Sequence, residues 1–221
     1  MSRTGLIAVV LVLLGGSVAA FAWTEKLKLK PAPVSKAHFV RRFSPTCGCH
    51  RSATRLTFRS RGRERVDVSI VDAAGDFVAT LVKGKEIPEG HVTFVWDGRD
   101  DGGRIVPDGL YRAKVRLHDA RRTLLIPAAI HVDTKAPKVN VVSVQAGTGV
   151  NVRYRTTEAA RSILRVDGRP VFRGARNHAG TARLQWPGPW PEPGSHEVTL
   201  VLVDRAGNRS EPTQPVAVDV P

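Results

Sequence analysis

The sequence predicts an all-β protein in which two tandem β-sandwiches follow an N-terminal hydrophobic helix and an extended linker. From residue 53 onward, apolar and polar side chains alternate with a period of two, as they do in half-buried antiparallel strands. Asp-Gly, Gly-Gly and Pro-containing turn signals separate the alternating runs, and such residues supply the backbone conformations of tight turns. The spacing of these short strands is typical of a sandwich rather than of a helical domain.

Residues 1–23 carry the pattern of an export signal. Arg3 precedes an uncharged stretch over 6–23, and small residues stand at Ala20 and Ala22, as signal peptidase requires. The alternative is an uncleaved membrane anchor, because about eighteen helical residues rise about 27 Å, just enough to cross the hydrocarbon core. Both alternatives stay open, and both predict an exported protein that is secreted or anchored to the outer face of the cytoplasmic membrane.

Residues 24–52 are expected to form a basic, Pro-containing linker. The formal net charge of the chain is +14, and half of it lies in residues 1–52, which hold eight basic residues and one acidic residue. Pro31 and Pro33 exclude a regular helix and favour a stiff, extended segment. A basic excess suits nucleic acid or an anionic membrane or wall polymer. Because the N-terminus indicates export, we expect an envelope protein or anionic envelope polymer as partner, and no nucleic acid.

The alternating runs divide into two halves, residues 53–134 and 135–221. The first half has strands around 65–70, 91–96 and 111–118, and the second has strands around 150–155, 198–202 and 216–220. Each half is about 80–90 residues long, near the size of an Ig-like or fibronectin-like sandwich. The boundary falls at residues 133–137, because Pro137 cannot continue a strand in the middle of a sheet.

Three motifs in residues 65–117 carry a family resemblance. They are Val-Asp-Val-Ser-Ile-Val-Asp-Ala-Ala-Gly at 66–75, Trp-Asp-Gly-Arg-Asp-Asp-Gly-Gly at 96–103, and Val-Pro-Asp-Gly-Leu-Tyr at 106–111. With them, this stretch resembles the Ig-like domain of flagellar hook-capping proteins of the FlgD type. Trp96 and Tyr111 are expected to fill the core at the ends of two strands. The second half resembles generic bacterial Ig-like repeats.

The most unusual cluster is formed by Cys47, Cys49 and His50. Two thiolates and an imidazole suit copper(I) or zinc, which would make the chain a small redox or metal-handling protein. In an oxidising compartment a Cys47–Cys49 disulfide is the simpler expectation. Free thiols or an intermolecular bridge form a third alternative, and the spacing alone does not decide among the three.

A row of basic side chains lies on one predicted strand. Arg112, Lys114 and Arg116 project from the same face at intervals of about 6.7 Å, so they are candidate contacts for a regular polyanion. Arg153 and Arg155 have the same spacing in the second half. The alternative is an ordinary solvated strand face, on which basic side chains also deter aggregation.

Carboxylates gather at two places where calcium binding is a question. Four aspartates share one loop: Asp97, Asp100, Asp101 and Asp108. Their spacing fails the EF-hand pattern, so we favour turn formation as their role. Asp133, Asp204 and Asn208 could meet at a domain end, as a second candidate. Whether calcium binds either set stays open.

The sequence predicts a non-catalytic structural, adhesion or binding module. The seven histidines are scattered and form no triad with a nucleophile, so we expect no catalytic site and no cofactor. Trp186 and Trp190 lie in a Pro-rich stretch, where they could stack on a sugar. The simpler interpretation is that both cap the core of the second sandwich.

Overall fold

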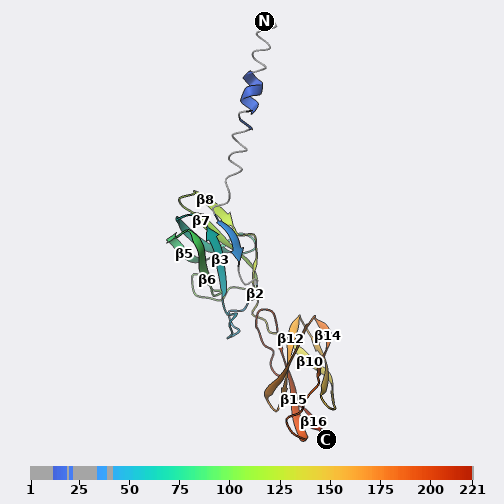
Figure 1. The fold of residues 1–221 in the computed structure, drawn as a ribbon. Helices are drawn as coiled ribbons and strands as arrows, with labels where there is room; N and C mark the ends of the chain where they lie inside the picture. Colours follow the sequence, from blue (N-terminus) through green and yellow to red (C-terminus); the bar gives the residue numbers. More distant parts are fainter. Residues whose placement is uncertain (1–11, 19, 22–33, 39–41, 221) are drawn as a thin grey trace.

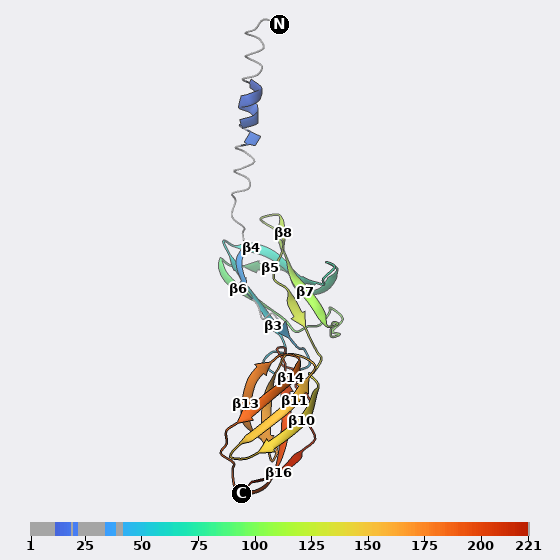
Figure 2. The ribbon, with the colours of Figure 1, turned by 90° about the vertical axis from the view of Figure 1, so that its right-hand side faces the viewer.

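The computed structural model of the chain describes residues 12–18, 20–21, 34–38 and 42–220. Residues 12–18 and 20–21 are helical. Within the described residues, no helix combines the length and the apolar character that crossing a membrane requires. Most of the predicted signal or anchor over 1–23, and the predicted linker residues 24–33, lie outside the described residues. Two β-sandwiches stand end to end, in the view of Figure 1 and in the turned view of Figure 2.

Strands dominate both sandwiches, which confirms the predicted all-β, Ig-like fold class. The described strands are β1 (Val34–His38), β2 (Arg42–Phe43), β3 (Thr54–Ser60), β4 (Glu64–Val71), β5 (Phe77–Ile87), β6 (Gly90–Trp96), β7 (Gly109–Leu117), β8 (Arg122–Leu125), β9 (Ile130–Val132), β10 (Val139–Ala146), β11 (Val150–Thr156), β12 (Ala160–Val166), β13 (Arg169–Asn177), β14 (Gly180–Trp186), β15 (Gly194–Val203) and β16 (Val216–Val220).

The first sandwich packs a β1-β3-β6 sheet against a β2-β9-β7-β4-β5 sheet, with β8 paired to β7. The short β2–β9 pair is parallel. Strand β7 shows the predicted period of two, because its buried residues alternate with exposed ones along the strand. Trp96 and Tyr111 are buried in the core as expected, with their ring centroids 5.2 Å apart.

The prediction that residues 24–52 form a linker is wrong for much of the part of this segment that the structure describes. Strand β1 pairs antiparallel with β3, and Phe43 is fully buried, with its ring centroid 5.6 Å from that of Trp96. Burial of a large aromatic side chain contributes about 1.5–3 kcal/mol, so Phe43 belongs to the first core. Phe43 has Arg41 and Arg42 before it and Ser44 after it, so it belongs to no alternating run from which a strand could be predicted.

The second sandwich packs a β10-β11-β14 sheet against a β13-β12-β15-β16 sheet. Strand β11 turns Val150, Val152 and Tyr154 into the core and its intervening residues outward. Trp186 is buried, and Trp190 packs against the same core. The two tryptophans therefore cap the second core, as their setting among prolines predicted.

Candidate functional site

The predicted basic row lies on an exposed sheet face of the first sandwich. Arg112, Lys114 and Arg116 are all exposed on β7, which β4 flanks on one side. Arg116 stands directly opposite Asp67 of β4, and His118 Nε2 lies 2.9 Å from Asp67 Oδ2. Hydrogen bonds from His118 and from the backbone hold the pKa of Asp67 below its ordinary value. Three cations thus face solvent beside one carboxylate, which leaves the row with a positive excess.

Cys47 and Cys49 form a disulfide in the loop between β2 and β3, and His50 next to it is exposed. Metal binding by cysteine requires thiolates, which a disulfide does not provide. The disulfide packs against the second sandwich: a Cβ added at Gly207 would lie 2.6 Å from Cys49 Sγ and 3.4 Å from Cys47 Sγ. The cysteine loop is therefore part of the contact between the two domains, which sequence reasoning missed.

Side chains from both domains hold this junction. The Asn208 side-chain amide donates to the backbone oxygens of Asp133 at 2.8 Å and Lys135 at 3.1 Å. Arg51 Nη1 donates to the backbone oxygen of Arg205 at 2.7 Å. Because one loop of the second sandwich, residues 204–208, contacts both the connecting segment and the cysteine loop, the junction has several independent contacts. The sequence placed Asp133, Asp204 and Asn208 together at a domain end, but it contained no signal that the cysteine loop would contact residues 204–208.

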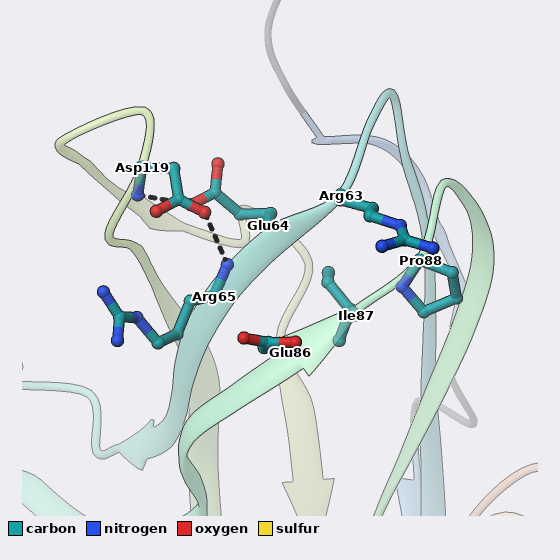
Figure 3. Close-up of a pocket in the computed structure, with 7 residues that line it drawn as sticks. All are labelled: Arg63, Glu64, Arg65, Glu86, Ile87, Pro88 and Asp119. Atoms are coloured by element: carbon teal, nitrogen blue, oxygen red, sulfur yellow. Dashed lines mark hydrogen bonds between the residues drawn. The ribbon is translucent and has the colours of Figure 1, made fainter.

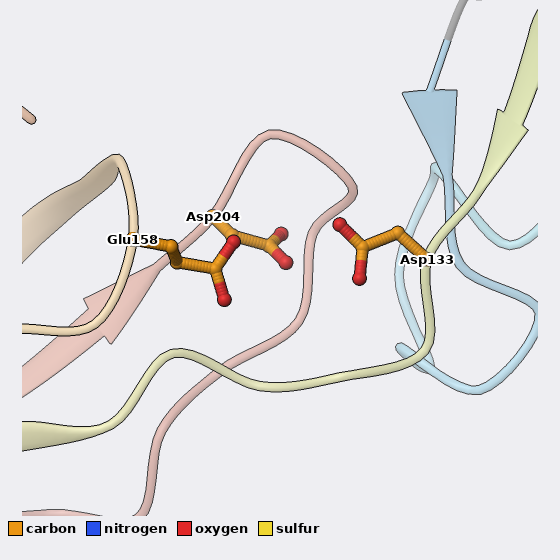
Figure 4. Close-up of side chains that lie close together, drawn as sticks. All are labelled: Asp133, Glu158 and Asp204. Atoms are coloured by element: carbon orange, nitrogen blue, oxygen red, sulfur yellow. The ribbon is translucent and has the colours of Figure 1, made fainter. Parts of the chain in front are cut away.

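An acidic cluster lies at the same junction (Figure 4). Ligand atoms of Asp133, Glu158 and Asp204 lie within 4.8 Å of one another, and among the described residues no other such group of three exists. Burial, with the nearby Asp133 and Asp204, raises the pKa of Glu158. The expected approach of Asp133 and Asp204 is thus observed, whereas Glu158 was not foreseen.

Two of the three carboxylates in this cluster already have partners at the junction. Asp204 Oδ1 accepts the N–H groups of Gly207 and Asn208, and Asp204 Oδ2 accepts the Asn208 amide. Arg42 Nη1 lies 3.5 Å from Asp133 Oδ2. Calcium takes six to eight oxygen ligands. Asn208 instead presents its NH₂ group, a hydrogen-bond donor, to the cluster. These hydrogen bonds stabilise the loop at residues 204–208, beside which the three carboxylates lie.

The carboxylates of the Asp-rich loop in the first sandwich accept hydrogen bonds from the loop's own turn and from two distant segments of the chain. Asp100 Oδ1 accepts the Arg104 N–H at 2.9 Å, and this bond is the main cause that lowers the Asp100 pKa. Asp101 accepts the N–H of Thr80 at 2.7 Å, and Asp108 accepts that of Thr134 at 2.8 Å. Each carboxylate serves a different backbone segment, so these three side chains do not converge on one point.

A cavity of about 580 Å³ lies where β4 begins and β5 ends (Figure 3). Glu64 is buried beside it and accepts the N–H groups of Asp119 and Ala120, which brace the turn between β7 and β8. Asp119 in turn accepts the N–H of Arg65 at 3.1 Å. The cavity mixes both signs of charge, and its most buried carboxylate has a structural role.

The tryptophans of the second sandwich belong to a packed column. The Trp186 and Trp190 ring centroids are 5.2 Å apart, and Trp190 stacks on His196 at 5.4 Å. His196 Nδ1 lies 2.7 Å from Asp167 Oδ2, and its Nε2 lies 2.8 Å from the Glu192 backbone oxygen. The Asp167 hydrogen bond, followed by the one to Glu192, raises the pKa of His196. The rings of Trp186, Trp190 and His196 therefore contact one another in turn within the second sandwich.

The fold and its surfaces define a two-domain β-sandwich protein of the Ig-like class with exposed basic strand faces. A family model described as the FlgD Ig-like domain matches residues 46–120, which include the three motifs on which the predicted resemblance rests. No curated protein matches the chain.

Solved structures similar to the chain include two from bacteria. Fibronectin(III)-like modules of CbhA from Clostridium thermocellum show 16% identity and a TM-score of 0.45, with 84% of this chain and 94% of that chain covered. FlgD from P. aeruginosa shows 22% identity and a TM-score of 0.32, with 55% and 87% covered.

Proposed function

We propose that the chain is a non-catalytic binding module of the bacterial cell envelope, exported and either secreted or anchored to the outer face of the cytoplasmic membrane. Three features support the proposal: the apolar N-terminal sequence, the Cys47–Cys49 disulfide, which suits an oxidising compartment, and the exposed basic row on β7. The proposal rests mainly on the basic row, because of these three features it is the one that a binding partner could contact.

The mechanism is presentation of regularly spaced cations by a rigid strand. Strand β7 pairs with β4, β8 and β9, so its backbone has little freedom. Arg112, Lys114 and Arg116 therefore repeat at about 6.7 Å on one face, where they meet successive negative groups of an anionic envelope polymer. Exposed charges are screened by salt, so this binding weakens as ionic strength rises.

Binding of the purified full chain to long-chain polyphosphate, measured at several salt concentrations, tests the basic row. Replacement of Arg112, Lys114 and Arg116 with Ser should weaken binding and flatten its salt dependence. The matched control replaces Arg55, Arg59 and Arg61 with Ser, which removes equal charge from β3 and the turn after it. Equal loss in the two triple variants would show that net charge alone drives binding and would refute a specific face.

The intact mass of the native protein, with free thiols alkylated and without reduction, tests export. Loss of residues 1–22 indicates cleavage, and a full-length mass on a membrane-bound chain accessible to external protease indicates an anchor. Absence of alkylation is expected for the disulfide. A full-length, protease-protected chain with two alkylated thiols would contradict the proposed location and would favour the redox or metal alternative built on Cys47, Cys49 and His50.

A further inference from the structure

A polar groove runs along the outer face of the β10-β11-β14 sheet of the second sandwich. One cavity of about 340 Å³ is lined by residues that include Ser143, Arg153 and Arg183. A second of about 720 Å³ extends to the turn at residues 147–149. Both are lined by Gln145, Asn151 and Gln185, so the two cavities form one continuous groove.

Two arginines face each other across this groove. Arg153 of β11 stands directly opposite Arg183 of β14, and both are exposed. Directly opposed like charges destabilise a sheet. Within the described residues, no ion pair involves either arginine, and neither cavity is lined by an aspartate or glutamate. The pair therefore lacks an anionic partner that the fold itself supplies.

The other opposed pair in this sandwich is different. Arg161 stands opposite Arg176 across β12 and β13, but Arg176 donates to the backbone oxygens of Ala159 and Asp204. Asp204 also contributes negative charge nearby. The fold therefore engages Arg176, whereas it leaves Arg153 and Arg183 facing solvent.

Three side-chain amides form a row beside the arginine pair, two residues further along each strand and on the same face of the sheet. Gln145 is directly opposite Asn151, which is directly opposite Gln185, and all three are exposed. Side chains directly opposite each other share one face of the sheet. A side-chain amide offers both donors and an acceptor, so such a row matches hydroxyl groups, which also donate and accept. Arginine matches carboxylates, which it can bind in bidentate fashion.

We propose that this face binds an acidic polysaccharide, with Arg153 and Arg183 holding a carboxylate and the amide row holding neighbouring hydroxyls. The inference rests on the proposed function in taking the chain to be a binding module, and it names the ligand class of one surface. A polysaccharide fits better than an extended peptide, because a peptide adds to an exposed sheet edge, whereas this groove crosses the middle of a sheet face.

Titration of the purified full chain with alginate, a polymer of uronic acids, tests the proposal. We expect alginate to bind and dextran, an uncharged polysaccharide, to bind far more weakly. Arg153→Ser or Arg183→Ser should each weaken alginate binding about tenfold or more, the effect of losing a hydrogen bond to a charged group. Neither substitution should lower the melting temperature of the free chain, because each relieves the opposed pair.

Arg173→Ser is the matched control, because Arg173 is also exposed but lies on the opposite sheet, where it stands opposite Ile163. It should change alginate binding little. Asn151→Ala tests the amide row: it should weaken binding of alginate and leave binding of poly-L-glutamate, an acidic polypeptide without hydroxyls, unchanged.

Three results would overturn the inference: no binding of alginate at low salt, equal loss of binding in Arg173→Ser and Arg153→Ser, or poly-L-glutamate bound as tightly as alginate. The Ser variant of Arg112, Lys114 and Arg116 separates this inference from the proposed function. If alginate fails to bind while polyphosphate still depends on the β7 row, only the inference about the groove is lost.

Discussion

Gly207→Ala should destabilise the protein through a specific clash at the domain junction. An added Cβ would lie 2.6 Å from Cys49 Sγ, 3.4 Å from Cys47 Sγ and 3.5 Å from Arg51 Cβ, whereas comfortable contacts are about 3.5–4.0 Å. Overpacking of this kind costs about 1–3 kcal/mol. The φ of Gly207 is +103°, and a conformation this unfavourable for alanine adds about 1–3 kcal/mol.

Gly180→Ala is the matched control, because Gly180 has φ +105° and no atom within 4 Å of an added Cβ. The two variants therefore share the backbone strain and differ in the clash. Scanning calorimetry should give the Gly207→Ala chain a free energy of unfolding about 1–3 kcal/mol lower than that of the Gly180→Ala chain. Each kcal/mol lowers the melting temperature of a domain this size by about 4–8 °C.

Removal of the sulfur atoms should abolish that difference. In a Cys47→Ala/Cys49→Ala background, Gly207→Ala and Gly180→Ala should agree within about 0.5 kcal/mol, the usual limit for independent sites. If Gly207→Ala is no more costly than Gly180→Ala while the disulfide is intact, the contact between the cysteine loop and the second sandwich is refuted.

Three further predictions concern the second sandwich and the junction. The pKa of His196 is raised above 6.5 and that of Asp167 is lowered below 3.8, so their contact stabilises the fold above pH 3.8, fully so up to pH 6.5, and is lost as pH rises through the folded His196 pKa. Thermal unfolding should therefore occur at a higher temperature at about pH 5.5 than at about pH 8.5, and a His196→Gln variant that keeps the same pH dependence would contradict this. The hydroxyl of Ser162 is buried with no hydrogen-bond partner among the described residues, so Ser162→Ala should raise the free energy of unfolding in urea by about 1 kcal/mol; a clear loss of stability would contradict the assignment. Asn208→Ala leaves two backbone oxygens without their donor and should cost about 1–3 kcal/mol, and Asn208→Asp should cost more because a carboxylate would face those oxygens. Unchanged urea midpoints in both variants would argue against the docked junction.

The sequence predicts the parts of this fold that local patterns determine. The period of two along β7 and β11 correctly indicates which residues face the cores, and the Trp-Asp-Gly motif correctly indicates burial of Trp96. Such patterns depend on neighbours within one strand. They arise because one face of each strand is buried.

Features that depend on distant parts of the chain could not be predicted in this way. Arg183 faces Arg153 only because β14 pairs with β11, and strand pairing in a sandwich depends on the whole topology. Glu158 joins the acidic cluster from a loop with no acidic neighbours in sequence. Phe43 enters the first core from a segment whose composition is that of a linker.

The positions of β1 and β16 determine how the two sandwiches carry mechanical load. Val34 of β1 pairs with Ser60, at the end of β3 away from the cysteine loop, and Val220 of β16 pairs with Gly194, at the end of β15 away from residues 204–208. Tension applied through these two ends therefore passes along both sandwiches in series (Figure 2). It pulls β1 and β16 parallel to their own axes, so the hydrogen bonds of each pair are loaded together in shear rather than opened one after another.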